Sequence, residues 1–484
     1  MITEILLFVV GTLLLHYLIS RPRGMPPGPM VIPYLGSRPI FSVADVQAMH
    51  KVYGDIFKSE LGPNKLIFLC NNKLIKEALA KVEFADRPSL ELMHFLTDGQ
   101  EAGVIMSNGK RWENARRFLL RNLRDLGMGK TYLEESILVE ARALVEDFRS
   151  GAGTPAHLPE SLNVAVLNII WQMVASKRYD LHDKEVLEPI AILRAVDSSS
   201  PILFVEFIPW LKKLIPGFLT ERIFVAQLRK VKDSMVTLMK TTIEAHRAKH
   251  DPANPRDVID EYLIAMDEKS EIAEYFSGGY AFCISRTKTI EDTMQQEDCL
   301  NIFVVDYLAK LIYYVYSSYG LMGIIFDLFA AGFDTTANAL RWVILYMAKY
   351  PEVQRRVQQQ IDEVVPRDTL PSYQHKSQIS HFDSCIGFEA MIRRFYLSCM
   401  VHNGIQRAAQ TDAYLGGYFI PKGSWIFGCA GICHVDSRYW DEPQEFRPER
   451  FLDQEGKVKI PKEGLMPFGS GKPHHMISLF QSSS

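Results

Sequence analysis

The chain has 484 residues, of which 47% are hydrophobic and 11% aromatic, so it is long enough to bury a large apolar core. Its formal net charge of −3 argues against nucleic acid as the main partner. The 7 cysteines are scattered and odd in number, which is typical of reduced thiols in a cytosolic compartment rather than of a disulfide framework.

The first segment of the chain predicts a membrane anchor. Residues 5–19 are nearly all apolar, and Arg21 and Arg23 follow directly. A bilayer span normally needs about 20 apolar residues, so this run is slightly short but plausible with its flanks. A cleaved signal peptide is the alternative, but Glu4 precedes the run where a signal has basic residues, and no small-residue cleavage site follows. We therefore assign residues 1–20 to one N-terminal anchor, and the positive-inside rule places the rest of the chain in the cytosol.

A proline-rich hinge is predicted over residues 21–35. Pro-Pro-Gly-Pro at positions 26–29 cannot continue a helix and stiffens the backbone. From there on we expect one folded domain, residues 36–484. It mixes short strands, such as residues 65–69, with helices that dominate residues 132–247, where apolar residues recur at spacings of three and four.

Two further apolar segments are candidates for membrane contact. Residues 201–216 touch a membrane, line the route by which a substrate enters, or form a buried helix junction. Residues 270–320 predict an atypical insertion, within which the run 300–319 is long enough to span a bilayer. Asp306 and Lys310 lie inside that run, and charges at a helix centre are costly in lipid, so an insertion is favoured over a second span.

A long helix is predicted over residues 321–350, followed by a polar helix over residues 352–364. In the first of these, Gly332 precedes Asp334 and Thr335. A mid-helix glycine costs about 1 kcal/mol relative to alanine, so it usually has a local reason. A threonine hydroxyl can bond back to a carbonyl of the previous turn and open a groove for a bound molecule or water. Alone, the pattern also fits a polar patch on a helix.

Trp112 and Arg116 lie one helical turn apart, on the same face of a predicted helix. Both side chains are donors suited to the two carboxylates of a planar cofactor, although an amphipathic basic helix is the simpler alternative. Near the C-terminal end, residues 446–451 read Phe-Arg-Pro-Glu-Arg-Phe and residues 467–471 read Pro-Phe-Gly-Ser-Gly. The small residues of the second motif let a backbone approach a flat cofactor closely.

Between these regions, residues 416–423 predict a strand, a proline turn and a second strand. Cys429, Cys433 and His434 follow and are residue types that bind zinc. No second ligand pair with suitable spacing comes after them, which argues against a zinc site.

Taken together, these motifs resemble the cytochrome P450 superfamily of haem-thiolate monooxygenases, specifically its membrane-anchored microsomal branch. The resemblance covers most of the chain and rests on six motifs in the family's order. They are the anchor with its Pro-Pro-Gly-Pro hinge, Phe-Ala-Asp-Arg-Pro at residues 84–88, the Trp112/Arg116 helix, the Ala-Gly-x-Asp-Thr-Thr helix, Pro-Glu-Arg-Phe, and Phe-Gly-x-Gly. The resemblance implies a mainly α fold with a small β portion, the cytochrome P450 fold, with haem as cofactor.

The resemblance also implies a role for each matching residue. Asp334 and Thr335 match the acid–alcohol pair that relays protons to iron-bound oxygen, and proton delivery into a dry site is what that chemistry requires. The haem-binding positions of the family correspond here to Trp112, Arg116, Arg407, Phe468, Gly469 and Gly471.

The partners implied by the family are a lipophilic small-molecule substrate, O₂, an NADPH-dependent reductase and the membrane, with no nucleic acid. The implied location is the endoplasmic reticulum membrane, with a single N-terminal anchor and the catalytic domain in the cytosol. The basic face near Arg116, Arg117, Arg121 and Arg124 is a candidate docking site for an acidic reductase, although a solvated surface is the default for such a run.

The chain departs from the family at the haem loop. The pattern Phe-Gly-x-Gly-x-Arg-x-Cys-x-Gly places the arginine at Pro473, the ligand cysteine at His475 and the last glycine at Ile477. Residues 473–484 are therefore a divergent tail, and we expect the helix and sheet that follow the loop in the family to be missing. A solvated histidine is favoured over an iron ligand for His475. The abrupt change after Lys472 is typical of a shifted reading frame or splice site.

A second departure concerns the family's Glu-x-x-Arg motif. If Arg394 is its arginine, the glutamate position holds Met391. Glu389 and Arg393 are four residues apart and form a possible substitute pair. Arg450 of the Pro-Glu-Arg-Phe motif is then expected to lack its usual network.

The implied function is haem-dependent monooxygenation of a lipophilic small molecule. A non-catalytic, degenerate or mis-assembled copy without thiolate-bound haem is the alternative, as is a lipophile-binding protein on the same fold. An isomerase that rearranges peroxides without O₂ is disfavoured because Asp334 and Thr335 are retained.

Overall fold

The computed structural model describes most of the chain between residues 22 and 466, with gaps. The described residues are 11–12, 22–33, 35–40, 42–90, 94–95, 97, 99, 102–126, 131–153, 157–194, 215–216, 225–267, 299–379, 406–459, 461 and 463–466. The chain divides into two compact units. The β unit comprises residues 1–88, 197–224 and 342–475, and the helical unit comprises residues 89–196, 225–341 and 476–484.

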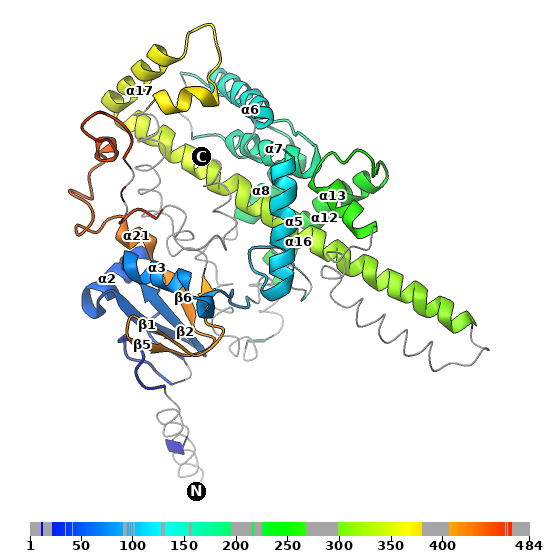
Figure 1. Cartoon of the computed structure of the whole chain (residues 1–484), viewed down its shortest axis with the longest axis horizontal. Coiled ribbons are helices and arrows are strands. Elements are labelled where there is room, and N and C mark those ends of the chain that lie inside the picture. Colours follow the sequence, from blue (N-terminus) through cyan, green and yellow to red (C-terminus); the bar gives the residue numbers. More distant parts are fainter. Residues whose placement is uncertain are drawn as a thin grey trace. The chain divides into compact units, whose positions relative to one another are not determined.

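A four-stranded sheet lies at the centre of the β unit (Figure 1). Its strands are β1 (Ile56–Leu61), β2 (Asn64–Leu69), β6 (Trp425–Gly428) and β3 (Arg407–Ala408), in that order across the sheet. The antiparallel pair β1–β2 turns at Gly62, whose φ of 56° suits glycine. β2 pairs in parallel with β6, with Leu69 opposite Gly428. The sheet therefore joins strands from the two ends of the chain.

Aromatic and aliphatic side chains of this sheet form the core of the β unit. Phe57, Phe68 and Phe427 stack across three strands, with successive ring centroids 5.0 and 4.9 Å apart. A hairpin of β4 (Ala413–Leu415) and β5 (Tyr418–Ile420) adds its own buried residues to a second cluster, on the opposite face of the sheet from the phenylalanine stack. The helices of this unit are α2 (Val43–Tyr53), α3 (Asn72–Ala80), η1 (Val82–Phe84), α17 (Pro351–Val364), η3 (Tyr373–Gln378), α21 (Ala430–Cys433) and η5 (Pro448–Phe451).

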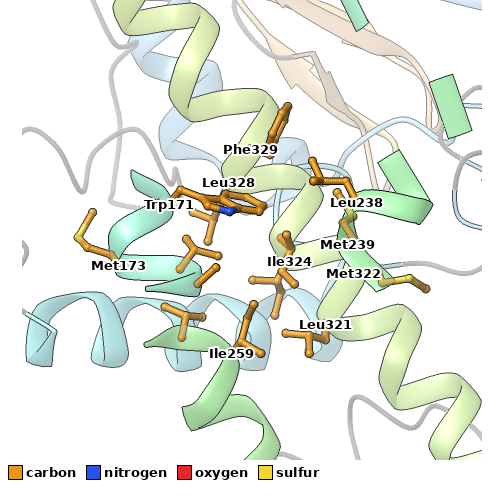
Figure 2. Packing of buried hydrophobic residues seen from close by; sticks show 14 of the residues in the cluster. Trp171, Met173, Leu238, Met239, Ile259, Leu321, Met322, Ile324, Leu328 and Phe329 are labelled. Carbon is orange, nitrogen blue, oxygen red and sulfur yellow. The ribbon is translucent and has the colours of Figure 1, made fainter. Parts of the chain in front are cut away.

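The helical unit is built around α7 and α16. Its helices are α5 (Gly109–Asp125), α6 (Thr131–Ser150), α7 (Ser161–Ala175), α8 (Lys184–Arg194), α12 (Ala226–Arg247), α13 (Val258–Asp267) and α16 (Cys299–Lys349), whose residues after 341 belong to the β unit. Almost every residue of α7 is buried, because its apolar side chains are not confined to one face. Trp171 of α7 meets Phe329 of α16 edge-on, with centroids 5.4 Å apart (Figure 2). Burial of such aromatic pairs dominates core energetics.

The sequence-based elements are largely confirmed in the described residues. The fold is mainly α with a small β portion, residues 65–69 lie in β2, and the polar helix is α17, which starts at Pro351 because proline suits the first turn of a helix. The strands around Pro421 are β5 and β6. The main difference is the start of α16, which lies at Cys299 rather than at residue 321.

The predicted insertion is therefore partly helical. Residues 299–320 are continuous with the helix that carries Asp334, whereas residues 270–298 lie outside the described part of the chain. Within the described residues, Gly320–Lys349 is long and apolar enough to cross a membrane, with a mean hydropathy of 1.3, but 61% of that window is buried, as in the core helix of a soluble protein. The anchor, apart from residues 11–12, and residues 201–214 lie outside the described residues.

The hinge is fastened to the edge of the sheet. The backbone N–H of Lys58 in β1 donates to the carbonyl of Pro27 at 2.8 Å. Gly28 makes this approach possible, since a Cβ at that position would lie 2.1 Å from the Lys58 carbonyl oxygen. The stiff proline segment is thus part of the folded unit.

We predict that Gly28→Ala lowers the free energy of unfolding by about 1–3 kcal/mol, because the clashing atom is backbone and cannot rotate away. Urea denaturation of the full chain measures the effect. Gly151→Ala is the control, since its nearest neighbour, the Phe148 carbonyl oxygen, lies at 3.9 Å, and it should change stability by less than about 0.5 kcal/mol. Equal effects of the two variants would contradict the prediction.

Candidate functional site

The Ala-Gly-Phe-Asp-Thr segment of α16 lies against α7 in the helical unit. The Thr335 hydroxyl donates to the carbonyl of Ala331 at 2.7 Å, so the predicted bond to the previous turn is confirmed. Gly332 has a packing reason that the sequence did not reveal. A Cβ there would lie 2.1 Å from the Cδ1 atom of Ile170 on α7. The glycine makes room for the Ile170 side chain at the turn that carries Asp334.

Asp334 is half-exposed and held by polar neighbours from two helices of the unit. Asn338, one turn further along α16, donates to its Oδ2 at 2.9 Å. The guanidinium of Arg194, the last residue of α8, lies 3.7 Å from its Oδ1 and also donates to both oxygens of Glu160 at 2.6 and 2.7 Å. A carboxylate that is 38% exposed and oriented in this way can take up a proton from solvent and pass it on.

Trp112 and Arg116 share a face of α5, as expected from their spacing. The Arg116 guanidinium lies 5.7 Å from the centroid of the Trp112 ring. Burial lowers the pKa of Arg116 because the charged form loses hydration. Three other basic side chains of the helix, Arg117, Arg121 and Arg124, are exposed. The helix therefore has one half-buried donor pair and a separate solvated cationic face.

Two arginines are buried together in the β unit. Arg407, in β3, is 6% exposed and donates to the Ala85 carbonyl at 2.7 Å, while Arg87 is 7% exposed and donates to the Gln406 carbonyl at 2.9 Å. Burial lowers the pKa of Arg407 to about 10, against the effect of Asp86. Burial and the charge of Arg407 lower the pKa of Arg87 to about 9. An anionic ligand beside these guanidinium groups would offset their repulsion.

Arg87 is a candidate site residue that the sequence analysis missed. It stands within the Phe-Ala-Asp-Arg-Pro motif at residues 84–88, which was used only to identify the family. The isolated bridge between Asp86 and Ala408 brings it beside Arg407. Nothing in the spacing of residues this far apart signals the pairing.

The haem loop lies outside the described residues, which include neither Phe468, Gly469 and Gly471 nor His475. The segment before it is described as far as Met466. The Met466 N–H donates to Nε2 of the buried His434 at 3.0 Å. The start of the loop is thus fastened to the residue after α21.

Arg450 is held by main-chain carbonyls. Its guanidinium donates to the oxygens of Asp441, Glu442, Glu445 and Arg447 at 2.8 to 3.2 Å. This network closes the segment between Trp440 and η5. Glu389, Met391, Arg393 and Arg394 lie outside the described residues, so their pairing stays a prediction.

Cys429 and Cys433 are both buried thiols. In the described part of the chain, the group whose ligand atoms lie within 4.8 Å of one another consists of His246, Asp257 and Asp260. His246 Nε2 is 2.8 Å from Asp257 Oδ2, and Arg256 donates to both oxygens of Asp260 at 2.6 and 2.9 Å. Because these groups already pair with one another, we interpret the cluster as a structural link between α12 and α13.

The sequence was compared with known families and proteins. The sequence profile described as Cytochrome P450 matches residues 22–278 and 282–473. Cytochrome P450 2L1 of Panulirus argus is 36% identical over 479 residues, which cover 98% of this chain and 88% of that protein. Cytochrome P450 2B19 of Mus musculus is 31% identical, covering 97% and 87% of the two chains, and Cytochrome P450 2J2 of Homo sapiens is 30% identical, covering 93% and 81%.

We predict a specific coupling between Gly332 and Ile170. Gly332→Val should destabilise the protein by about 1–3 kcal/mol through overpacking, and Ile170→Ala should remove the clashing methyl group, so the double variant should recover about 0.5–3 kcal/mol of the summed losses. A thermal or urea double-mutant cycle measures this coupling.

The control for that cycle is Thr336→Val, which places a branched side chain at an exposed position of the same helix. Its coupling to Ile170→Ala should be near zero. An equal coupling at both positions would show that the effect does not come from the close approach at Gly332.

Proposed function

Because this chain belongs to the cytochrome P450 family, we propose that its function is the monooxygenation of a lipophilic small molecule with O₂ and electrons from an NADPH-dependent reductase. The family is one of haem-dependent monooxygenases, so the chain is by family an oxidoreductase with haem as the expected cofactor. The observation that carries the proposal is the Asp334–Thr335 pair on α16, with Thr335 bonded to Ala331. This pair would serve no purpose in a peroxide isomerase.

The side chains of the β unit fit the acidic edge of haem. Arg407 and Arg87 are buried cations with lowered pKa values, and a carboxylate is the ligand that would offset the cost of burying their charges. In the helical unit, Arg116 and Trp112 form a separate donor pair. When bound, haem supplies the activation of O₂.

The proton-handling residues have distinct tasks. Asp334 takes protons from solvent, and Arg194 and Asn338 hold its carboxylate in place. The hydrogen of the Thr335 hydroxyl is committed to Ala331, so its oxygen is free to accept a hydrogen bond from water. To pass a proton onward, Thr335 must rotate its hydroxyl away from Ala331.

We assign the cellular location and the domain organisation of the protein from its membership of the same family. The protein lies at the endoplasmic reticulum membrane, with residues 1–20 as its single anchor and residues 36–484 as one haem-monooxygenase domain in the cytosol. Within this domain, residues 270–320 are an atypical insertion and residues 473–484 a divergent tail. The exposed Arg117, Arg121 and Arg124 provide the docking face for the reductase.

A non-catalytic protein on the same fold is the second candidate. It is favoured by one observation, since the last cysteine of the sequence is Cys433 and the family's ligand position holds His475. An imidazole ligand gives globin- or peroxidase-like behaviour, because it lacks the electron donation of a thiolate. The residues present therefore fit the edge of haem but not its thiolate-ligated iron.

Restoring the loop tests the proposed function. We predict that the full chain with Pro473→Arg, His475→Cys and Ile477→Gly binds haem and, when reduced under carbon monoxide, shows the thiolate-type Soret band. If the haem-loaded protein lacks that band, the proposal that this chain's fold supports monooxygenation is wrong.

The unsubstituted chain decides between the two candidates in the same measurement. A thiolate-type band identifies a working oxygenase, whereas an imidazole-type band or a lack of haem identifies the non-catalytic candidate.

We further predict that Arg407→Leu in the restored chain lowers the affinity for haem roughly 10- to 100-fold, the loss of a charged hydrogen bond. Haem titration measures the affinity. The free energy of unfolding of the haem-free protein should fall by less than the free energy of haem binding. The reason is that the variant also removes a buried like charge beside Arg87. Arg121→Leu, at an exposed position, is the control and should leave haem affinity unchanged.

A further inference from the structure

Asp327 is a buried carboxylic acid that the proposed reaction does not use. It lies on α16 ahead of Asp334, and only 7% of its surface is exposed. Its Oδ2 accepts two backbone hydrogen bonds, from the N–H of Val104 at 2.5 Å and from the N–H of Ile105 at 2.9 Å. Two successive N–H groups directed at one oxygen form an anion-binding nest.

Two glycines make this contact possible. Gly103 has a φ of +79°, and a Cβ there would lie 2.2 Å from Asp327 Oδ2. On the other side, a Cβ at Gly323 of α16 would lie 2.6 Å from the Gly103 nitrogen. The Ser107 hydroxyl donates to the Gly103 carbonyl at 2.6 Å and closes the turn. Residues 102–107 are therefore shaped to fit the helix at Asp327.

We propose that the Asp327 carboxyl is a proton-controlled latch that positions residues 102–107 against α16. These residues lead directly into α5, which begins at Gly109 and carries Trp112 and Arg116. The latch thereby sets the start of the helix that presents this donor pair. It links that helix to α16 through one side chain.

The protonation behaviour follows from the surroundings of Asp327. Burial raises its pKa to about 7, although the hydrogen bonds from Val104 and Ile105 act in the opposite direction. Neither residues 102–107 nor residues 323–331 contain another ionisable side chain, and no charged group contributes to the shift. Desolvation of this one carboxyl is thus the controlling effect.

The sign of the response comes from linkage. When residues 102–107 detach, water reaches Asp327 and its pKa returns to about 3.9. Between these two pKa values, the closed latch keeps a proton that the open latch releases, so closure is favoured at low pH and opening increases as the pH rises toward 7. Opening should increase roughly 10- to 100-fold between pH 5 and pH 7.

Hydrogen exchange of the Val104 and Ile105 amides in the full chain tests the latch and needs no bound haem. We expect their protection factors, corrected for intrinsic exchange, to fall by this amount between pH 5 and pH 7. Asp327→Asn keeps an oxygen that accepts both bonds but cannot ionise, so its protection factors should stay constant over this range. Asp327→Ala removes the acceptor and should lower protection at every pH.

Asp125→Asn is the matched control, since this acid lies at the exposed end of α5 in the same unit, and it should retain the pH response of the parent chain. Constant protection in the parent chain overturns the proposal, as does an unchanged pH response in Asp327→Asn. The parent measurement decides the question even if a variant does not fold. A failure of haem binding would count against the proposed function and leave the latch intact.

Discussion

The close contact between α7 and α16 is the constraint on which the helical unit depends. Gly332 leaves room for the Ile170 side chain of α7, and the Trp171–Phe329 pair joins the same two helices. A Cβ at Gly332 would lie 2.1 Å from the Ile170 Cδ1 atom, so this side chain would have to move beside Asp334 and Thr335. The position of the polar pair is thus set by apolar packing, since interiors packed at crystal density transmit small shifts.

Local features were predictable from the sequence because their physics is local. The one-turn spacing of Trp112 and Arg116 and the bond from Thr335 to Ala331 follow from helix geometry, and both are present. The start of α16 at Cys299 was not predicted, because the charges at Asp306 and Lys310 argued against a second membrane span and the segment was assigned to an insertion.

Contacts between residues far apart in the chain could not be predicted from the sequence, for a different reason. Arg87 meets Arg407 only because a bridge places Asp86 opposite Ala408, and chain positions so far apart carry no common period. The contact between the Gly103 turn and Asp327 could not be predicted either, since nothing in the sequence around one residue indicates that the other lies beside it. The network expected for Arg450 stays a prediction, because residues 389–394 lie outside the described part of the chain, where backbone carbonyls accept hydrogen bonds from its guanidinium.

The hydrogen bond between Met466 and His434 has a consequence for the loop that follows it. It fixes the backbone just before residue 467, upstream of the stretch in which the family carries its iron ligand. Both groups of this bond, a main-chain N–H and an imidazole, lie outside that stretch. The attachment before the loop therefore does not depend on which residue occupies the ligand position.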